Sequence, residues 1–122
     1  MNSFKYKISL RVYETSCNPS DITKLLGYDE FRSRKLGEKD LYYWVAQLVD
    51  NSSEKKLGCC LENLLGEFVQ KSKEFLYLNS HSKQIMLIIA TFTSKHHGFV
   101  LSSDLVKVFG GLNIDIGFEI YP

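Results

Sequence analysis

The sequence has no clear excess of charge of either sign, since 15 basic residues are balanced by 14 acidic ones and the net charge is +1. A protein dedicated to nucleic acid needs a basic excess to neutralise phosphates, so we do not expect nucleic acid as its partner. Long apolar runs are missing too. The longest, Ile85 to Ala90, is far shorter than the ~20 residues that span a bilayer, and no apolar signal segment follows Met1. We therefore expect no membrane partner and a cytoplasmic location.

Cysteine and histidine are scarce, and their spacing does not suit a metal. The adjacent pair Cys59-Cys60 lacks the C-x-x-C spacing of zinc and redox sites. His96 and His97 stand side by side in a polar segment, where no neighbouring carboxylate or thiol completes a ligand set. His81 lies in a similarly polar segment. We expect solvated histidines, no metal and no other cofactor.

Recognisable catalytic motifs are also missing. A nucleophilic thiol needs a base beside it, and Cys59 and Cys60 lie among leucines with no histidine near them in the sequence. Gly110-Gly111 is not followed by the Lys-Ser/Thr of a phosphate-binding loop. The acidic residues are scattered, without a spacing typical of general acid–base catalysis. The sequence therefore gives no specific reason to propose an enzyme, and we expect a binding protein without catalytic residues.

The composition is that of one ordered domain. Hydrophobic residues make up 44% and charged residues 24% of the 122 residues, which is close to the average of globular proteins. Eight Phe, seven Tyr and Trp44 supply bulky apolar surface for one core, and a second core would not fit this length. We predict a single domain over residues 1–122, with Trp44 largely buried.

The first half of the chain shows both strand and helix periodicity. Apolar and polar residues alternate from Phe4 to Val12, which predicts a half-buried strand. Asn18-Pro19 is a helix start, and Gly27 ends that helix. Residues 28–40 are charged and aperiodic, so we predict a connecting loop there. Leu41 to Val49 is rich in aromatic and β-branched residues and predicts a second strand.

The second half contains one long amphipathic pattern. After a turn at Asn51-Ser52-Ser53, the spacing predicts a single helix over Glu54 to Leu78. Its inward positions are Leu57, Leu61, Leu64, Leu65, Phe68, Phe75 and Leu76. Ile85 to Thr93 is apolar on both faces and predicts an interior strand. A third helix capped by Ser102 or Ser103 follows, and then an amphipathic strand from Ile114 to Ile120.

These elements predict an α+β protein, more specifically a ferredoxin-like two-layer sandwich. We expect a mainly antiparallel sheet of four or more strands with helices on one face. Ser20–Gly27 and Ser103–Gly110 are identical at four of eight positions. Either both are short capped helices with the same local requirements, or they belong to a duplicated strand–helix–strand unit. Both explanations predict the same two layers.

Several short motifs follow one another in a fixed order. The opening strand leads into Asn18-Pro19-Ser20-Asp21-Ile22-Thr23-Lys24-Leu25-Leu26-Gly27, and then come Arg32 with Lys35-x-Gly37-Glu38, Trp44, Leu101-Ser102 and Ile114-Asp115-Ile116. Over nearly the whole chain this order resembles a mostly bacterial family of small proteins catalogued as a domain of unknown function. The sequence departs from that family at Glu30-Phe31, just before the Arg32 segment, where the family has a proline. The resemblance implies this fold and a cytoplasmic setting, and it brings no activity.

Residues 30–39 are the most unusual segment. Arg32, Arg34 and Lys35 are closely spaced cations, and the next strand carries Tyr42, Tyr43 and Trp44. Interfaces favour arginine and aromatic residues, and loops on a rigid scaffold often carry binding sites. Either the acids of this loop neutralise its cations in solvent, or Arg32, Arg34 and Lys35 contact a partner.

A second candidate surface is the wet face of the first strand, where Lys5, Lys7 and Arg11 alternate with apolar residues. If that strand lies at a sheet edge, its lysines only block unwanted strand pairing.

We therefore expect a non-enzymatic protein-binding module. One specific form is a bacterial immunity protein that neutralises a toxin domain by covering its active site, because such proteins are small and lack catalytic residues. The alternative is a small-ligand sensor or hydrolytic enzyme with a pocket between helix and sheet. A large exposed aromatic patch favours the binding module, and a buried polar cluster favours the alternative.

Overall fold

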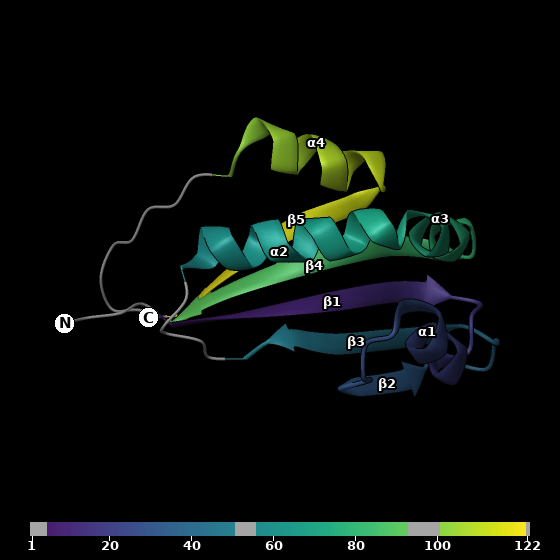
Figure 1. Ribbon diagram of the computed structural model, residues 1–122. Coiled ribbons are helices and arrows are strands. Elements are labelled where there is room, and N and C mark those ends of the chain that lie inside the picture. The colour runs from purple at the N-terminus through teal and green to yellow at the C-terminus, as the bar shows by residue number, and fades with distance from the viewer. Residues whose placement is uncertain (1–4, 51–55, 93–100, 122) are drawn as a thin grey trace.

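The fold is an α+β arrangement in which helices cover one face of a five-stranded sheet (Figure 1). The computed structural model describes residues 5–50, 56–92 and 101–121. In chain order its elements are β1 (Lys5–Thr15), α1 (Pro19–Leu26), β2 (Arg32–Lys35), β3 (Tyr42–Val49), α2 (Leu57–Gln70), α3 (Ser72–Ser80), β4 (Ser82–Phe92), α4 (Ser103–Gly111) and β5 (Ile114–Tyr121). The predicted turn at 51–53 and the segment with His96 and His97 lie outside the described residues.

The strands are arranged in the order β2-β3-β1-β4-β5. The pairings of β2 with β3, β3 with β1 and β1 with β4 are antiparallel, and β5 runs parallel to β4. The sheet is therefore mixed. The predicted α+β class and the placement of the helices on one face are confirmed.

Strand β1 shows how the sequence pattern becomes a layered structure. Tyr6, Ile8, Leu10 and Val12 are buried against the helices, while the residues between them face the other side of the sheet. Because β1 pairs with both β3 and β4, it is an interior strand. The interpretation of its lysines as guards of a sheet edge is therefore wrong.

The predicted helix caps are confirmed. Asn18 Oδ1 accepts the backbone N–H of Ser20 at 3.0 Å, and Ser102 Oγ accepts that of Leu105 at 3.2 Å. Gly27 ends α1 with a φ of 77°, a left-handed conformation that glycine adopts without steric strain.

The predicted single helix from Glu54 to Leu78 is wrong, because the chain forms α2 and α3 with a break at Lys71. The backbone of Lys71 leaves the helical region at a φ of −103° and a ψ of 24°. Phe68 and Phe75 still meet in the core across this break, with ring centroids 4.7 Å apart. The altered direction of α3 leaves Leu76, expected to face inward, 56% exposed.

The predicted loop over residues 28–40 contains a strand, which is a second correction. Strand β2 pairs antiparallel with β3, so that Arg32 lies opposite Val45 and Lys35 opposite Tyr42. None of the four residues of β2 is buried. A strand with water on both faces has no alternation of apolar and polar residues, and therefore no sequence signal.

Trp44 on β3 is fully buried, as predicted. Its indole Nε1–H donates to Thr23 Oγ1 at 3.2 Å, which ties β3 to α1. The core around it includes Ile22 and Leu26 of α1 and Leu10 of β1.

Candidate partner-binding face

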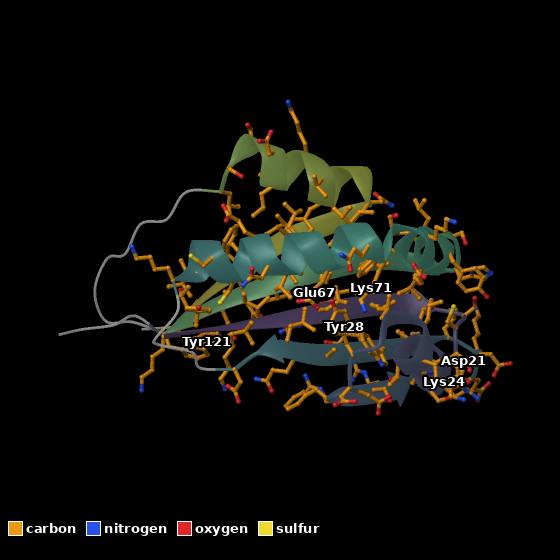
Figure 2. All side chains as sticks on the ribbon, in the orientation of Figure 1. Asp21, Lys24, Tyr28, Glu67, Lys71 and Tyr121 are labelled. Atoms are coloured by element: carbon orange, nitrogen blue, oxygen red, sulfur yellow. The ribbon has the colours of Figure 1, made fainter. Side chains whose placement is uncertain are left out.

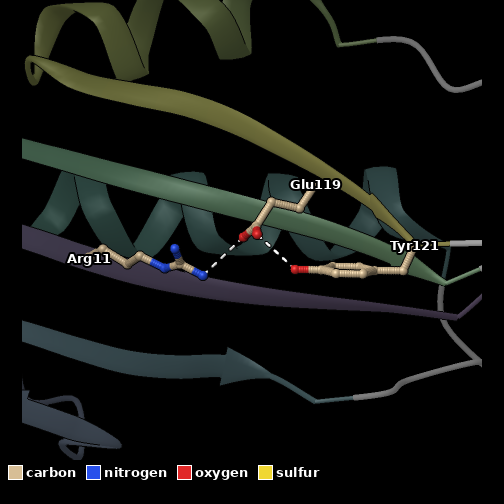
Figure 3. A network of polar contacts seen from close by, with 3 residues as sticks. All are labelled: Arg11, Glu119 and Tyr121. Carbon is tan, nitrogen blue, oxygen red and sulfur yellow. Dashed lines mark hydrogen bonds and ion pairs between the residues drawn. The ribbon is translucent and has the colours of Figure 1, made fainter.

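The face of the sheet opposite the helices carries the candidate site, and we call it the open face. Figure 3 shows part of it, with helices on the far side of the strands. Its residues are Lys5, Lys7, Ser9, Arg11 and Tyr13 of β1, Arg32 and Arg34 of β2, Tyr43, Val45 and Gln47 of β3, Gln84, Met86, Ile88, Ala90 and Phe92 of β4, and Asp115, Gly117, Glu119 and Tyr121 of β5.

The register joins the two surfaces that the sequence suggested separately. Val45 lies opposite Arg11 on one side and opposite Arg32 on the other. Because paired residues project to the same side of a sheet, Arg11 and Arg32 flank Val45 in one row of the open face. Lys35 alternates away from Arg32 and Arg34 and forms an ion pair with Asp40 at 3.4 Å. The structure therefore brings two of the three predicted cations together and separates the third.

Arginine and tyrosine side chains from three strands form a cluster on the open face. We call Arg11, Tyr13, Arg32, Arg34 and Tyr43 the Arg–Tyr cluster. The rings of Tyr13 and Tyr43 lie 5.1 Å apart between centroids, and the Arg34 guanidinium carbon lies 5.6 Å from the Tyr43 ring centroid. A depression of about 490 Å³ lies here, lined by Tyr13, Glu14, Arg32, Arg34, Leu36 and Tyr43.

Two of the three arginines in the cluster carry a positive charge that no ion pair among the described residues balances. Within residues 5–50, 56–92 and 101–121, neither Arg32 nor Arg34 forms an ion pair. Glu14 is the one acid that lines the depression, and its Oε1 is already in an ion pair with Lys83 Nζ at 3.8 Å. The guanidinium groups of Arg32 and Arg34 thus have donors to offer to an acidic ligand.

Arg11 is held more firmly than the other two arginines. Its Nη2 donates to Glu119 Oε1 at 3.0 Å, and Glu119 Oε2 accepts the hydroxyl of Tyr121 at 2.8 Å (Figure 3). The Nε–H of Arg11 is buried and has no acceptor in the described part of the chain. Burial lowers the pKa of Arg11, but hydrogen bonding to Tyr13 and the fields of nearby groups raise it by more, so the net pKa shift is upward. Arg11 is therefore always charged.

Tyr43 of the cluster stays neutral at physiological pH. Burial raises the pKa of Tyr43 above its ordinary value, and the positive charges of Arg11 and Arg32 lower it by less. A neutral phenol leaves the charge of the arginines uncompensated and adds a flat apolar ring beside them.

The open face continues past Arg11 toward β4 and β5. A second depression of about 280 Å³ shares Arg32 with the first and extends to Phe92 and Tyr121. The rings of Phe92 and Tyr121 are stacked with their centroids 5.0 Å apart, and Lys7 Nζ lies 5.6 Å from the centroid of the Phe92 ring. Phe31, at the entrance to β2, is 61% exposed. The face thus combines aromatic rings with cations, a composition that interfaces favour.

A separate depression of about 460 Å³ beside α1 contains Cys17, Asp21 and His81. His81 Nδ1 lies 2.9 Å from the Tyr77 carbonyl oxygen, and no hydrogen bond joins Cys17 to His81 among the described contacts. No three His, Cys, Asp or Glu side chains gather closely enough to hold a metal within the described ranges. This depression lacks the base-activated thiol that nucleophilic chemistry requires.

Sequence reasoning identified Arg32 and Arg34 but missed that Arg11, Tyr13 and Tyr43 join them. The alternation in β1 does place Arg11 and Tyr13 on the wet face. Strand order was the missing information, because only the pairing of β1 with β3 brings these residues beside β2.

Comparison with models of protein families, with curated proteins and with solved structures found no match. The resemblance to a family of small, mostly bacterial proteins therefore stays a proposal. None of the helices in the described residues is long and apolar enough to cross a bilayer.

Proposed function

We propose that this chain is a non-enzymatic protein-binding module whose open face binds an acidic surface of another protein. The observation that carries this proposal is the pair Arg32 and Arg34, which project from one strand without ion-pair partners among the described residues. Guanidinium groups hold carboxylates in two-point contacts. The neighbouring tyrosines add area that loses little conformational entropy on binding.

A protein partner fits the open face better than a nucleic acid does. A strand of phosphates requires a continuous basic path, whereas Glu119 and Asp115 lie on the same face as the arginines. Lys7 is paired with Asp50 at 3.6 Å. This mixture of signs suits a partner surface of matching pattern, in which acidic groups would meet Arg32 and Arg34, which form no ion pair in the described part of the chain.

The more specific parts of this proposal concern family, setting and partner. We propose a ferredoxin-like unit formed by the antiparallel order β2-β3-β1-β4, to which α4 and β5 are added. A cytoplasmic bacterial setting follows from the family resemblance. A toxin-neutralising immunity protein is one form of such a module, and its partner would then be a toxin domain with an acidic surface.

A hydrolytic enzyme or small-ligand sensor is the second proposal. The depression with Cys17 and His81 is the observation in its favour. We place this proposal second because the Cys17 thiol and the His81 imidazole are not hydrogen-bonded to each other.

Site-specific photo-cross-linking tests the proposed function. A benzophenone amino acid is placed at Phe31, beside the Arg–Tyr cluster, or at Tyr77 on α3, which is 54% exposed. We expect the Phe31 probe to cross-link a protein through an acidic segment, and the Tyr77 probe not to. Mass spectrometry identifies the linked peptide.

Two outcomes would contradict the proposal. A partner captured from Tyr77 but not from Phe31 would place the interface on the helical layer. A nucleic acid captured from Phe31 would change the class of partner.

A further inference from the structure

Strand β2 forms one outer edge of the sheet. It pairs only with β3, and no strand of the described residues lies beyond it (Figure 1). An edge strand presents backbone N–H and C=O groups to which another extended segment can bond.

The register identifies which backbone groups point outward. Leu36 N–H donates to Leu41 O at 2.8 Å, and the same register pairs Arg34 with Tyr43 and Arg32 with Val45. Just before β2, Phe31 N–H also donates to Val45 O at 2.8 Å. Hydrogen-bonded pairs alternate along an antiparallel ladder, so Arg32 and Arg34 bond to β3, and Leu36 bonds to Leu41 just before it. The N–H and C=O groups of Ser33 and Lys35 therefore point toward the outer edge.

The side chains of β2 alternate between the two faces of the sheet. Arg32 and Arg34 project to the open face, and a strand added at the edge would place its own side chains beside them. Residues in the non-hydrogen-bonded pairs of a ladder have their side chains closest together. Carboxylates at alternate positions of the added strand would meet Arg32 and Arg34.

Charge decides which segment can occupy this edge. Cations on an edge strand commonly prevent unwanted pairing, and β2 of a second copy would bring Arg and Lys against Arg and Lys. Opposite charges across a strand pair are favourable and like charges are not. The same cations that exclude a second copy select an acidic segment.

We propose that an extended acidic segment of the partner protein adds to the sheet beside β2, bonding to the backbone of Ser33 and Lys35 and placing carboxylates opposite Arg32 and Arg34. This inference rests on the proposed function and names the conformation of the bound segment.

The probe is a synthetic peptide that alternates glutamate with threonine, with a glutamine–threonine peptide as its uncharged control. Nuclear magnetic resonance of the protein follows binding. We expect amide exchange at Ser33 and Lys35 to slow in the presence of the glutamate peptide. Peptides N-methylated on one alternate set of residues should bind at least tenfold more weakly than those methylated on the other set, because only one set faces β2.

A variant of the protein gives a second test. Ser33→Pro removes an outward N–H and leaves the ladder to β3 intact, as proline at an edge strand can. We expect it to keep its melting temperature and to bind the glutamate peptide at least tenfold more weakly, whereas Ser33→Ala binds normally.

The inference is overturned if the peptide does not bind, if both methylated sets bind equally, or if Ser33→Pro binds normally. It is also overturned if the chain dimerises through β2. The proposed function survives all of these results when the cross-link from position 31 to an acidic segment stands, so the two claims fail separately.

Discussion

Arg11 stands at the centre of the open face and joins it to the far edge of the sheet. Its guanidinium is fixed by Glu119, and its buried Nε–H has no acceptor in the described part of the chain. An unsatisfied buried donor costs about 1–3 kcal/mol, whereas a partly exposed ion pair contributes only ~0–1 kcal/mol. Burying this donor therefore costs more free energy than the ion pair returns, which is consistent with the proposed binding role of the open face.

Replacing Arg11 tests this explanation. Arg11→Met keeps the apolar stem and removes the charge, so we expect the free energy of unfolding to change by less than about 1 kcal/mol. Affinity for the partner should fall by roughly fivefold, which corresponds to ~1 kcal/mol. Urea unfolding and calorimetry measure the two quantities. A large loss of stability with unchanged affinity would make Arg11 a structural residue.

Trp44, unlike Arg11, is a residue whose role is to stabilise the fold. It is fully buried, and its ring fills the space between β3 and α1. Trp44→Ala should lower the free energy of unfolding by ~3–5 kcal/mol, because it leaves a cavity and removes the hydrogen bond to Thr23. Denaturant unfolding checks this, and a loss below about 1 kcal/mol would contradict the packing described here.

At the scale of the elements, the side chain of Tyr28, which follows α1 and Gly27, contacts α2 and the residue after it. The Tyr28 hydroxyl donates to Glu67 Oε1 at 3.1 Å, and Lys71 Nζ lies 5.0 Å from the centre of the Tyr28 ring (Figure 2). Burial, the negative charge of Glu67 and the hydrogen bond to it raise the pKa of Tyr28 well above its ordinary value.

This shift predicts a loss of stability in alkali. The pKa of Tyr28 in the unfolded chain is about 10, so below that pH the stabilisation is fully present. Above it the unfolded state releases a proton that the folded state retains, and the free energy of unfolding falls as the pH rises. We expect Tyr28→Phe to show a shallower fall than the natural chain in urea unfolding between about pH 9 and 11. An equal slope would contradict the assignment.

Elements with a local signal could be predicted from the sequence, and those without one could not. Asn18, Gly27 and Ser102 satisfy backbone groups within their own helices, so their roles are visible without the fold. Strand β2 exists because β3 pairs with it, and its exposed residues show no pattern. The break at Lys71 was hidden because Phe68 and Phe75 are spaced as in one continuous helix.

At the scale of the whole molecule, the candidate binding surface is a product of strand order. Arg11 and Arg32 are distant in the sequence and become neighbours in one row only because β1 pairs with β3 and β3 with β2. Single-sequence patterns describe which face a residue occupies, and they do not specify which strand lies beside it. Arg32 and Arg34 were therefore predictable as candidates, while the cluster around them was not.

The central claim is that Arg32 and Arg34 on the open face bind an acidic partner, and charge reversal tests it most directly. The double variant Arg32→Glu/Arg34→Glu is compared with Lys73→Glu/Lys107→Glu, which makes the same change in net charge at exposed positions of α3 and α4. Both should keep melting temperatures within a few degrees of the natural chain, because exposed charges contribute only ~0–1 kcal/mol.

Calorimetry with the partner identified by cross-linking then gives the decisive affinities. We predict that the arginine variant binds at least tenfold more weakly, or ~1.4 kcal/mol, with a larger difference at low salt, while the lysine variant binds like the natural chain. Equal affinities for the natural chain and the arginine variant, or equal losses in both variants, would contradict the account.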